Sequence, residues 1–181
     1  MEHPVAVLLE EHRLIERMLA EVESRVLMGG PQLPVEFVET ALDFFATFAD
    51  GSHHHKEERV LFPMLEAAGM PVHGGPIAVM LHEHDLGRRC LAAVRNHLAA
   101  AKTGSQEAAS AIRVALAEYV ELLRRHIWKE DNILFEMAKV RLASDAEMAE
   151  MKRLFEEEAK ATGLRERYEA ILNEVTGTAV Y

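Results

Sequence analysis

The chain has 181 residues, a net charge of −10 and one cysteine, Cys90. This length suits one domain with a sizeable core, the acidic balance argues against a nucleic-acid partner, and a lone cysteine excludes an internal disulfide and fits a reducing cytoplasm. Because no stretch approaches the ~20 apolar residues of a membrane span and the N-terminus shows no signal peptide, we expect a soluble cytoplasmic protein that does not enter a membrane.

The first predicted helix begins near Pro4 and ends before Gly29. Its apolar residues recur at steps of three and four, which is the pattern of an amphipathic bundle helix. They are Val5, Leu8, Ile15, Leu19, Val22 and Val26. His12 takes one position of this stripe, four residues after Leu8 and three before Ile15. The helix therefore carries a histidine on the face that we expect to be buried.

The second predicted helix begins at Pro34 and ends at Gly69, a favourable stop signal. Its apolar stripe consists of Val38, Leu42, Phe45, Ala49, Val60 and Met64. In the middle of this stripe stand His53 and Glu57, which are four residues apart and therefore share a helix face. Pro63 lacks a backbone donor, so we expect the helix to kink or restart there.

The third and fourth predicted helices also carry polar residues on their apolar stripes. The third begins at Pro76 and has one histidine, His84, on its stripe. The fourth alternates steps of four and three without a break, and His126 and Glu130 fall within that pattern. Its apolar positions are Ile112, Leu116, Tyr119, Leu123, Ile133 and Met137. All four helices thus place a histidine on the predicted inner face.

The remaining chain predicts a short helical extension. Ser144 and Glu147 are spaced as a capping box that opens a fifth helix, and Gly163 interrupts that helix before a last short segment. Four long helices with short connections predict an all-α fold, an up-down-up-down four-helix bundle over residues 1–143. One or two extra helices over residues 144–181 are expected to pack on it as a C-terminal extension.

Two segments repeat one motif. H-H-H-K-E-E-R-V-L-F-P-M at 53–64 and H-I-W-K-E-D-N-I-L-F-E-M at 126–137 each begin with a histidine, place a glutamate four residues later and end in a similar apolar tail. His54 and Glu58 are also four residues apart, but the shared tail favours the first pair. A carboxylate buried alone is costly, and cations among the imidazoles relieve that cost. The predicted metal ligands are His12, His53, Glu57, His84, His126 and Glu130.

Each of these residues taken singly has a simpler interpretation. A lone histidine on an apolar stripe is usually a core residue, and a histidine–glutamate pair on a helix is usually a surface pair. The coincidence of one histidine on each of four stripes favours a metal site, and these donors suit iron, zinc or manganese. Residues expected around the site or at the surface are His54, His55, Glu58 and Asp131. Expected surface histidines are His3, His73, His82 and His97, and expected packing residues are Cys90 and Met80.

Three segments together resemble the hemerythrin-like, or HHE cation-binding, superfamily. They read H-H-x-K-E-E-x-V-L-F-P-M at 53–64, G-P-I-x-V-M-L-x-E-H-D-x-G-R at 75–88 and H-I-x-K-E-D-N-x-L-F at 126–135. The pattern is most similar to bacterial HHE proteins and to iron-centre repair di-iron proteins. The resemblance implies a non-haem centre of two iron ions with an oxo or hydroxo bridge. It assigns His12 and His53 to one iron, His84 and His126 to the other, and Glu57 and Glu130 to bridging positions.

The sequence departs from the oxygen-carrying hemerythrins at two positions. Carriers have two histidines one turn apart on the third helix, whereas Met80 stands one turn before His84 here. Carriers have an aspartate five residues after the fourth-helix histidine; this chain has Asp131 there but also Glu130, which the repeat with Glu57 favours. Four histidines and two carboxylates leave more open coordination than a carrier has. This favours reaction with dioxygen, peroxide or nitric oxide over reversible oxygen storage.

We therefore expect a di-iron protein of hemerythrin type that reacts with or senses oxygen, peroxide or nitric oxide. The alternatives are a peroxide- or nitric-oxide-linked enzyme, an iron-centre repair protein, a reversible oxygen carrier and a bundle that the metal merely holds together. The expected partner is a small diatomic or peroxide ligand, and the sequence identifies no protein partner. A sensor needs a segment whose order depends on the metal, and the tail after Ser144 is the candidate.

Overall fold

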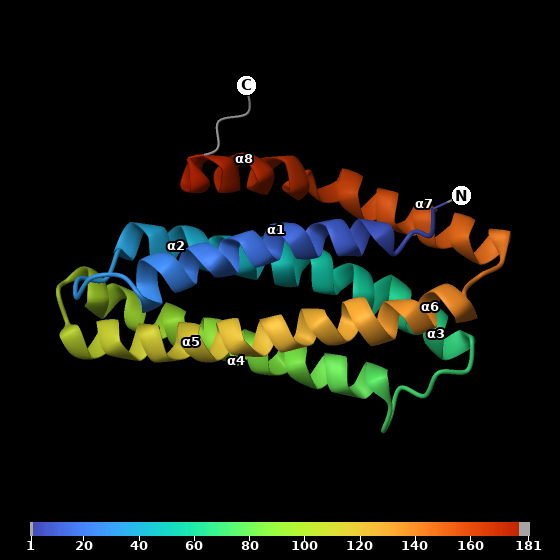
Figure 1. Cartoon of the computed structure of the whole chain (residues 1–181), viewed down its shortest axis with the longest axis horizontal. Coiled ribbons are helices and arrows are strands. Elements are labelled where there is room, and N and C mark those ends of the chain that lie inside the picture. The colour runs from blue at the N-terminus through green and yellow to red at the C-terminus, as the bar shows by residue number, and fades with distance from the viewer. Residues whose placement is uncertain (1, 178–181) are drawn as a thin grey trace.

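Four long helical segments run alternately up and down, as the apolar stripes predict (Figure 1). The structure is a computed structural model that describes residues 2–177, without the side chains of residues 161 and 162. The segments are α1 (Ala6–Val22) with the π-helical η1 (Glu23–Leu27); α2 (Val35–Asp43), η2 (Phe44–His54), η3 (Glu57–Leu61) and α3 (Phe62–Ala67); α4 (Pro76–Lys102); and α5 (Gln106–Lys129), η4 (Glu130–Leu134) and α6 (Phe135–Arg141). α7 (Asp145–Thr162) and α8 (Leu164–Thr176) follow. The all-α class with extra C-terminal helices is confirmed, and no helix in the described part combines the length and apolar character needed to cross a membrane.

Local sequence signals set the helix ends. Pro76 occupies the first turn of α4, where a missing N–H removes no helical hydrogen bond. The Ser144 hydroxyl accepts a hydrogen bond from the Glu147 amide at 3.3 Å, and the Glu147 carboxylate accepts one from the Ser144 amide at 3.1 Å. This is the predicted capping box, and it starts α7. Gly163 has a left-handed φ of 56°, which ends α7 and lets α8 begin in a new direction.

Three of the six predicted ligands lie in π-helical turns. His53 belongs to η2, Glu57 begins η3 and Glu130 begins η4. Such turns are rare, and they are frequent at functional sites. Pro63 stands in the first turn of α3, so the predicted restart lies where the second segment changes from π-helix to α-helix.

Two apolar clusters enclose the polar positions along the bundle. The larger cluster includes Phe44, Phe45, Phe48, Ile112, Leu116 and Tyr119. The other includes Leu8, Leu61, Phe62, Leu134 and Phe135. In every segment, the core-packed apolar residues of the stripe on one side of the predicted histidine ligand belong to the larger cluster, and those on the other side belong to the smaller cluster. The histidines therefore lie where the two clusters meet. Each fully buried large side chain contributes about 1.5–3 kcal/mol, and this packing holds the polar layer in place.

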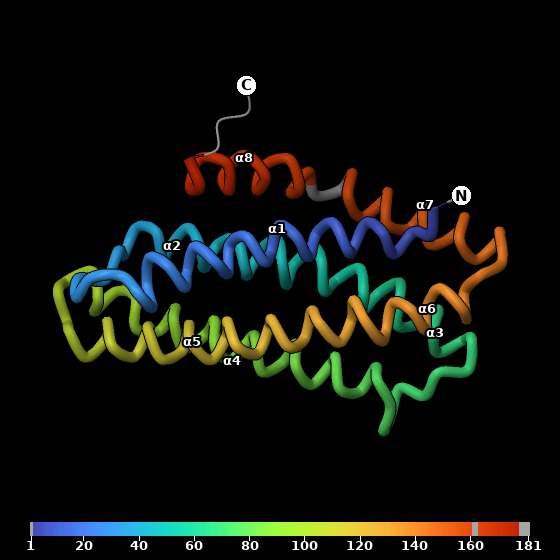
Figure 2. Tube along the Cα trace, viewed as in Figure 1, coloured from blue at the N-terminus to red at the C-terminus, as the bar shows by residue number. Residues whose placement is uncertain are grey.

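α7 and α8 lie along one side of the bundle (Figures 1 and 2), where α8 packs beside α1 and η2, and α7 packs beside η2 and η3. The Tyr168 hydroxyl on α8 donates to the Asp43 carboxylate at 2.9 Å, and its ring packs edge-on against Phe44. The Arg17 guanidinium on α1 donates to the side chain of Asn173 at 3.0 Å. These contacts dock the extension on the bundle. That residues 1–143 and 144–181 form two separate units stays a prediction, and residues 1 and 178–181 lie outside the described residues.

Candidate metal centre

The six predicted ligands meet in one buried layer across the bundle. None of them is more than 2% exposed. They come from all four segments: His12 from α1, His53 and Glu57 from the second segment, His84 from α4, and His126 and Glu130 from the fourth segment. The apolar stripes therefore point to the same region of the core.

Each glutamate contacts one histidine of each predicted pair. The two oxygens of Glu57 lie 3.5 Å from His53 Nε2 and 3.4 Å from His84 Nε2. Oε2 of Glu130 lies 3.2 Å from His12 Nε2 and 3.2 Å from His126 Nε2. Two carboxylates placed between two imidazole pairs form an arrangement that can bridge two cations.

The polar atoms that face the layer are poorly satisfied. The carboxylate oxygens of Glu57 and Glu130, and Nε2 of His12 and His53, are buried without a hydrogen bond of good geometry. An unsatisfied buried polar group costs about 1–3 kcal/mol, and more when it is charged. Metal ions accept electron pairs from such carboxylate oxygens and imidazole nitrogens, so the residues fit bound cations.

A second ring of carboxylates orients the four predicted histidines. Nδ1 of His12 lies 2.6 Å from Asp131, and Nδ1 of His53 lies 3.1 Å from Glu11. Nδ1 of His84 lies 2.8 Å from Glu58, and Nδ1 of His126 lies 3.0 Å from Glu83. A carboxylate that accepts the Nδ1 proton fixes the tautomer and directs a bare Nε2 towards a metal. Every predicted histidine ligand is held in this way.

Sequence reasoning found half of these outer carboxylates. Glu58 and Asp131 were expected around the site, and each of them bonds to a histidine of the site. Glu11 and Glu83 were missed, because on one helix they read as charges of the solvent face. Their only signal is position: each immediately precedes a stripe histidine, so it can reach the histidine of a neighbouring segment.

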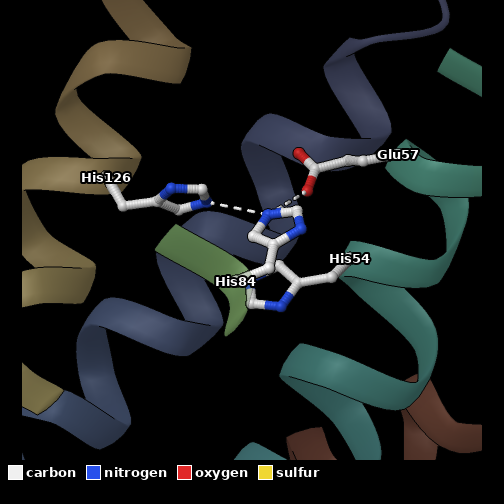
Figure 3. A group of neighbouring side chains, drawn as sticks. All are labelled: His54, Glu57, His84 and His126. Carbon is white, nitrogen blue, oxygen red and sulfur yellow. Dashed lines mark hydrogen bonds and ion pairs between the residues drawn. The ribbon is translucent and has the colours of Figure 1, made fainter. Parts of the chain in front are cut away.

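The other histidines differ from their expected places in two cases. His73, His82 and His97 are exposed, as expected. His3 is partly buried, and its Nε2 lies 3.2 Å from the carbonyl oxygen of Leu142. His54 was expected around the site or at the surface; it is only 4% exposed and lies inside the polar layer (Figure 3).

Within the described part of the chain, two groups of side chains offer donor atoms close enough for a metal ion. One consists of His12, His53, Glu57 and Glu130, and the other of His54, Glu57, His84 and His126. Within each group the donor atoms lie within 4.8 Å of one another. Glu57 belongs to both groups, as a bridging carboxylate would. Met80 is 3% exposed and belongs to the smaller apolar cluster, as a packing residue does.

The carboxylates favour positive charge on the layer. Burial alone would lower the pKa of His12, but hydrogen bonds with Asp131 and Glu130 raise it to about 9. Burial would also lower the pKa of His126, but the nearby charge of Glu130, together with hydrogen bonds to Glu130 and Glu83, raises it to about 10. Without a metal these imidazoles hold protons, and a bound cation must displace them.

A groove of about 610 Å³ reaches one side of the layer. It is lined by residues of α1 and of the C-terminal helices, and it extends to Glu11, Ser52 and Lys56. Lys56 is 1% exposed, and its ammonium donates to Glu11 at 2.7 Å and to Ser52 at 3.1 Å. Burial opposes ionisation of Glu11, but its bonds with His53 and Lys56 lower its pKa below the usual value. Glu11 therefore lines the groove and also contacts His53, a predicted ligand.

Comparison with known proteins agrees with this geometry. The chain is 38% identical over 89 residues to the iron-sulfur cluster repair protein YtfE of Musicola paradisiaca and 37% identical over 89 residues to that of Dickeya chrysanthemi. Each alignment covers 48% of this chain and 40% of the relative, so the chain spans well under two thirds of these proteins. An uncharacterized protein of Mycobacterium tuberculosis is 26% identical over 153 residues, which are 83% of this chain and 59% of that protein. No solved structure was found to match. The model of the hemerythrin HHE cation binding domain matches residues 3–138, and the chain belongs to this family.

Proposed function

We propose that the chain binds two iron ions in the buried layer and reacts with, or senses, oxygen, peroxide or nitric oxide. His12 and His53 would hold one iron, His84 and His126 the other, and Glu57 and Glu130 would span both. The observation that carries the proposal is that each glutamate contacts one histidine of each pair. Bound iron would supply redox chemistry and Lewis acidity.

Iron is favoured over zinc or manganese by two considerations. Bundle interiors with glutamates and histidines on facing helices are where di-iron carboxylate centres are built. The relatives with 37–38% identity are named as iron-sulfur cluster repair proteins. Repair of iron centres is therefore the second candidate function. It stays second because the chain covers only 40% of those proteins.

The protein's own residues limit what can reach the layer. Apolar clusters on both sides exclude bulk water, which suits small ligands and strengthens charge interactions inside. The groove that ends at Glu11 and Lys56 supplies a polar approach on the His53 side. The Lys56 ammonium donates to Glu11, the outer partner of His53. Because four histidines and two carboxylates would leave open coordination on the metals, we expect oxidation by oxygen to proceed to completion rather than stop at a stable oxygen adduct.

Stopped-flow mixing of the anaerobically reduced, iron-loaded protein with oxygen, and separately with hydrogen peroxide and with nitric oxide, tests the proposal. We expect a rapid change of the absorption spectrum with at least one of these ligands and no lasting oxygen adduct. A stable and reversible oxygen spectrum would favour the oxygen-carrier alternative. Absence of any reaction with oxygen, peroxide and nitric oxide would contradict the proposed function and leave a structural role for the metal.

A further inference from the structure

We infer that His54 is a fifth histidine ligand and binds the metal held by His84 and His126. The inference rests on the proposed function, because it concerns the same centre. It differs from the sequence interpretation, which placed His54 around the site or at the surface. It also reduces the open coordination expected from four histidines and two carboxylates.

The first observation is the location of the His54 ring. Donor atoms of His54, Glu57, His84 and His126 lie within 4.8 Å of one another. The ring of His54 lies flat against that of His84, with centroids 3.9 Å apart and planes 16° apart (Figure 3). The donor atoms of these four side chains therefore converge on one position in the layer.

The second observation is that Nε2 of His54 has no partner. This atom is buried without a hydrogen bond, whereas Nδ1 lies 3.3 Å from the Asp50 carboxylate. An Nδ1 proton donated to Asp50 leaves Nε2 as a free electron pair inside the layer. Nε2 of His54 is therefore available to a metal ion, and the Asp50 carboxylate holds the ring from its other nitrogen.

The third observation is that His54 shares the surroundings of the four predicted histidine ligands. All five have Nδ1 within 3.3 Å of a carboxylate and Nε2 in the buried layer. The histidines outside the layer differ. His97 bonds to the Ala93 carbonyl on its own helix, and His55 is half exposed beside Glu158. The carboxylate–histidine pattern therefore marks five residues rather than four.

A single arginine, Arg88, braces two of the three outer carboxylates on this side. The Arg88 guanidinium donates to Asp50 at 2.9 Å and to Glu58 at 2.7 Å. Asp50 is the partner of His54, and Glu58 is the partner of His84. Both imidazoles are consequently positioned by one polar network, as metal ligands commonly are.

The simpler interpretation is that His54 only packs against His84. A packing role does not require a nitrogen, and an unsatisfied buried Nε2 is destabilising. An aromatic or aliphatic side chain would fill the same space without that penalty. With His54 as a ligand, the centre has three histidines on one metal and two on the other. The more open metal is then the one held by His12 and His53, on the side where Glu11 reaches the groove.

The test counts coordinated histidines by proton NMR of the cobalt(II)-loaded protein. Each histidine that binds cobalt through Nε2 carries an Nδ1 proton, which gives a strongly shifted signal that exchanges with solvent. We expect five such signals in water that disappear in deuterium oxide, and four in His54→Asn. His55→Asn is the matched control, because His55 is the next residue but lies half exposed, and it should keep five.

The outcomes separate the inference from the proposed function. Four signals in the unmodified protein, or five in a folded His54→Asn variant, would overturn the role of His54 and leave the di-metal centre intact. No shifted signal in the unmodified protein would mean that the proposed centre itself is absent. If His54→Asn does not fold, Asp50→Asn decides. It should speed solvent exchange of one of the five signals, and a set of signals unchanged by Asp50→Asn would refute the inference.

Discussion

Separate substitutions of Glu130 and of its neighbour Asp131 distinguish a proposed metal ligand from a residue that only orients a ligand. Glu130 is fully buried and lies 3.2 Å from the Nε2 atoms of both His12 and His126. Removing one member of a buried charge cluster costs about 3–5 kcal/mol, so we expect Glu130→Ala to destabilise the metal-free protein by about that amount. The variant should also lose the stabilisation that bound metal gives, which is about 4 kcal/mol at a thousandfold excess over Kd.

Asp131→Ala should be much milder. The Asp131 carboxylate is 16% exposed and contacts the outer Nδ1 of His12 and the exposed guanidinium of Arg13. Loss of such an outer partner typically lowers metal affinity about 10–100-fold. Metal content after desalting, together with urea unfolding of the metal-free and metal-loaded forms, measures both effects. If Asp131→Ala empties the site while Glu130→Ala keeps two metals, the ligand assignment on the fourth segment is wrong and the oxygen-carrier register is right.

Three further predictions follow from the same contacts. Met80→His buries an imidazole in an apolar cluster, so we expect a loss of about 1–3 kcal/mol in urea unfolding. It should add no shifted signal in the cobalt protein, and a sixth signal would show that a position on the second metal was open. Lys56→Met leaves Glu11 without its buried cation and should lower the free energy of unfolding by about 3–5 kcal/mol. Lys152 lines the same groove but is exposed, so Lys152→Met should change that free energy by less than about 0.5 kcal/mol. Equal effects of the two substitutions would contradict the role of burial. In the metal-free protein the pKa values of His12 and His126 are raised to about 9 and about 10. Their stabilisation is thus fully present below the unfolded-state pKa of about 6.5 and is lost as pH rises through 9 to 10. The urea midpoint of unfolding should fall across this pH range for the metal-free protein and stay level for the metal-loaded protein. A parallel fall in both forms would refute the assignment of His12 and His126 as metal ligands.

The bundle and the six polar residues that meet in its buried layer could be predicted because they obey one periodicity. His12, His84 and His126 take apolar-stripe positions on long regular helices, so a spacing of three and four residues finds them. The repeated histidine–glutamate spacing placed Glu57 and Glu130 on the same face. Short-range rules also gave the capping box at the start of α7.

His54 escaped the same reasoning because the helix is not α-helical there. It lies in η2, a π-helical segment, and a π-helical turn takes more residues than an α-helical turn. His53 and His54 are consequently rotated less far apart than two α-helical neighbours, and both face the layer. Glu11 and Glu83 escaped for another reason. Each bonds to a histidine on a different segment, and only tertiary packing shows which segment lies next to it.

The most direct test of the central claim is metal analysis of the protein from iron-supplemented cells, with absorption spectra recorded before and after reduction. The account predicts about two iron atoms per chain, the number that two bridging carboxylates and two histidine sets hold. It also predicts near-ultraviolet charge-transfer bands in the oxidised protein that bleach on reduction. Stoichiometric zinc, with no iron in any preparation, would contradict the account.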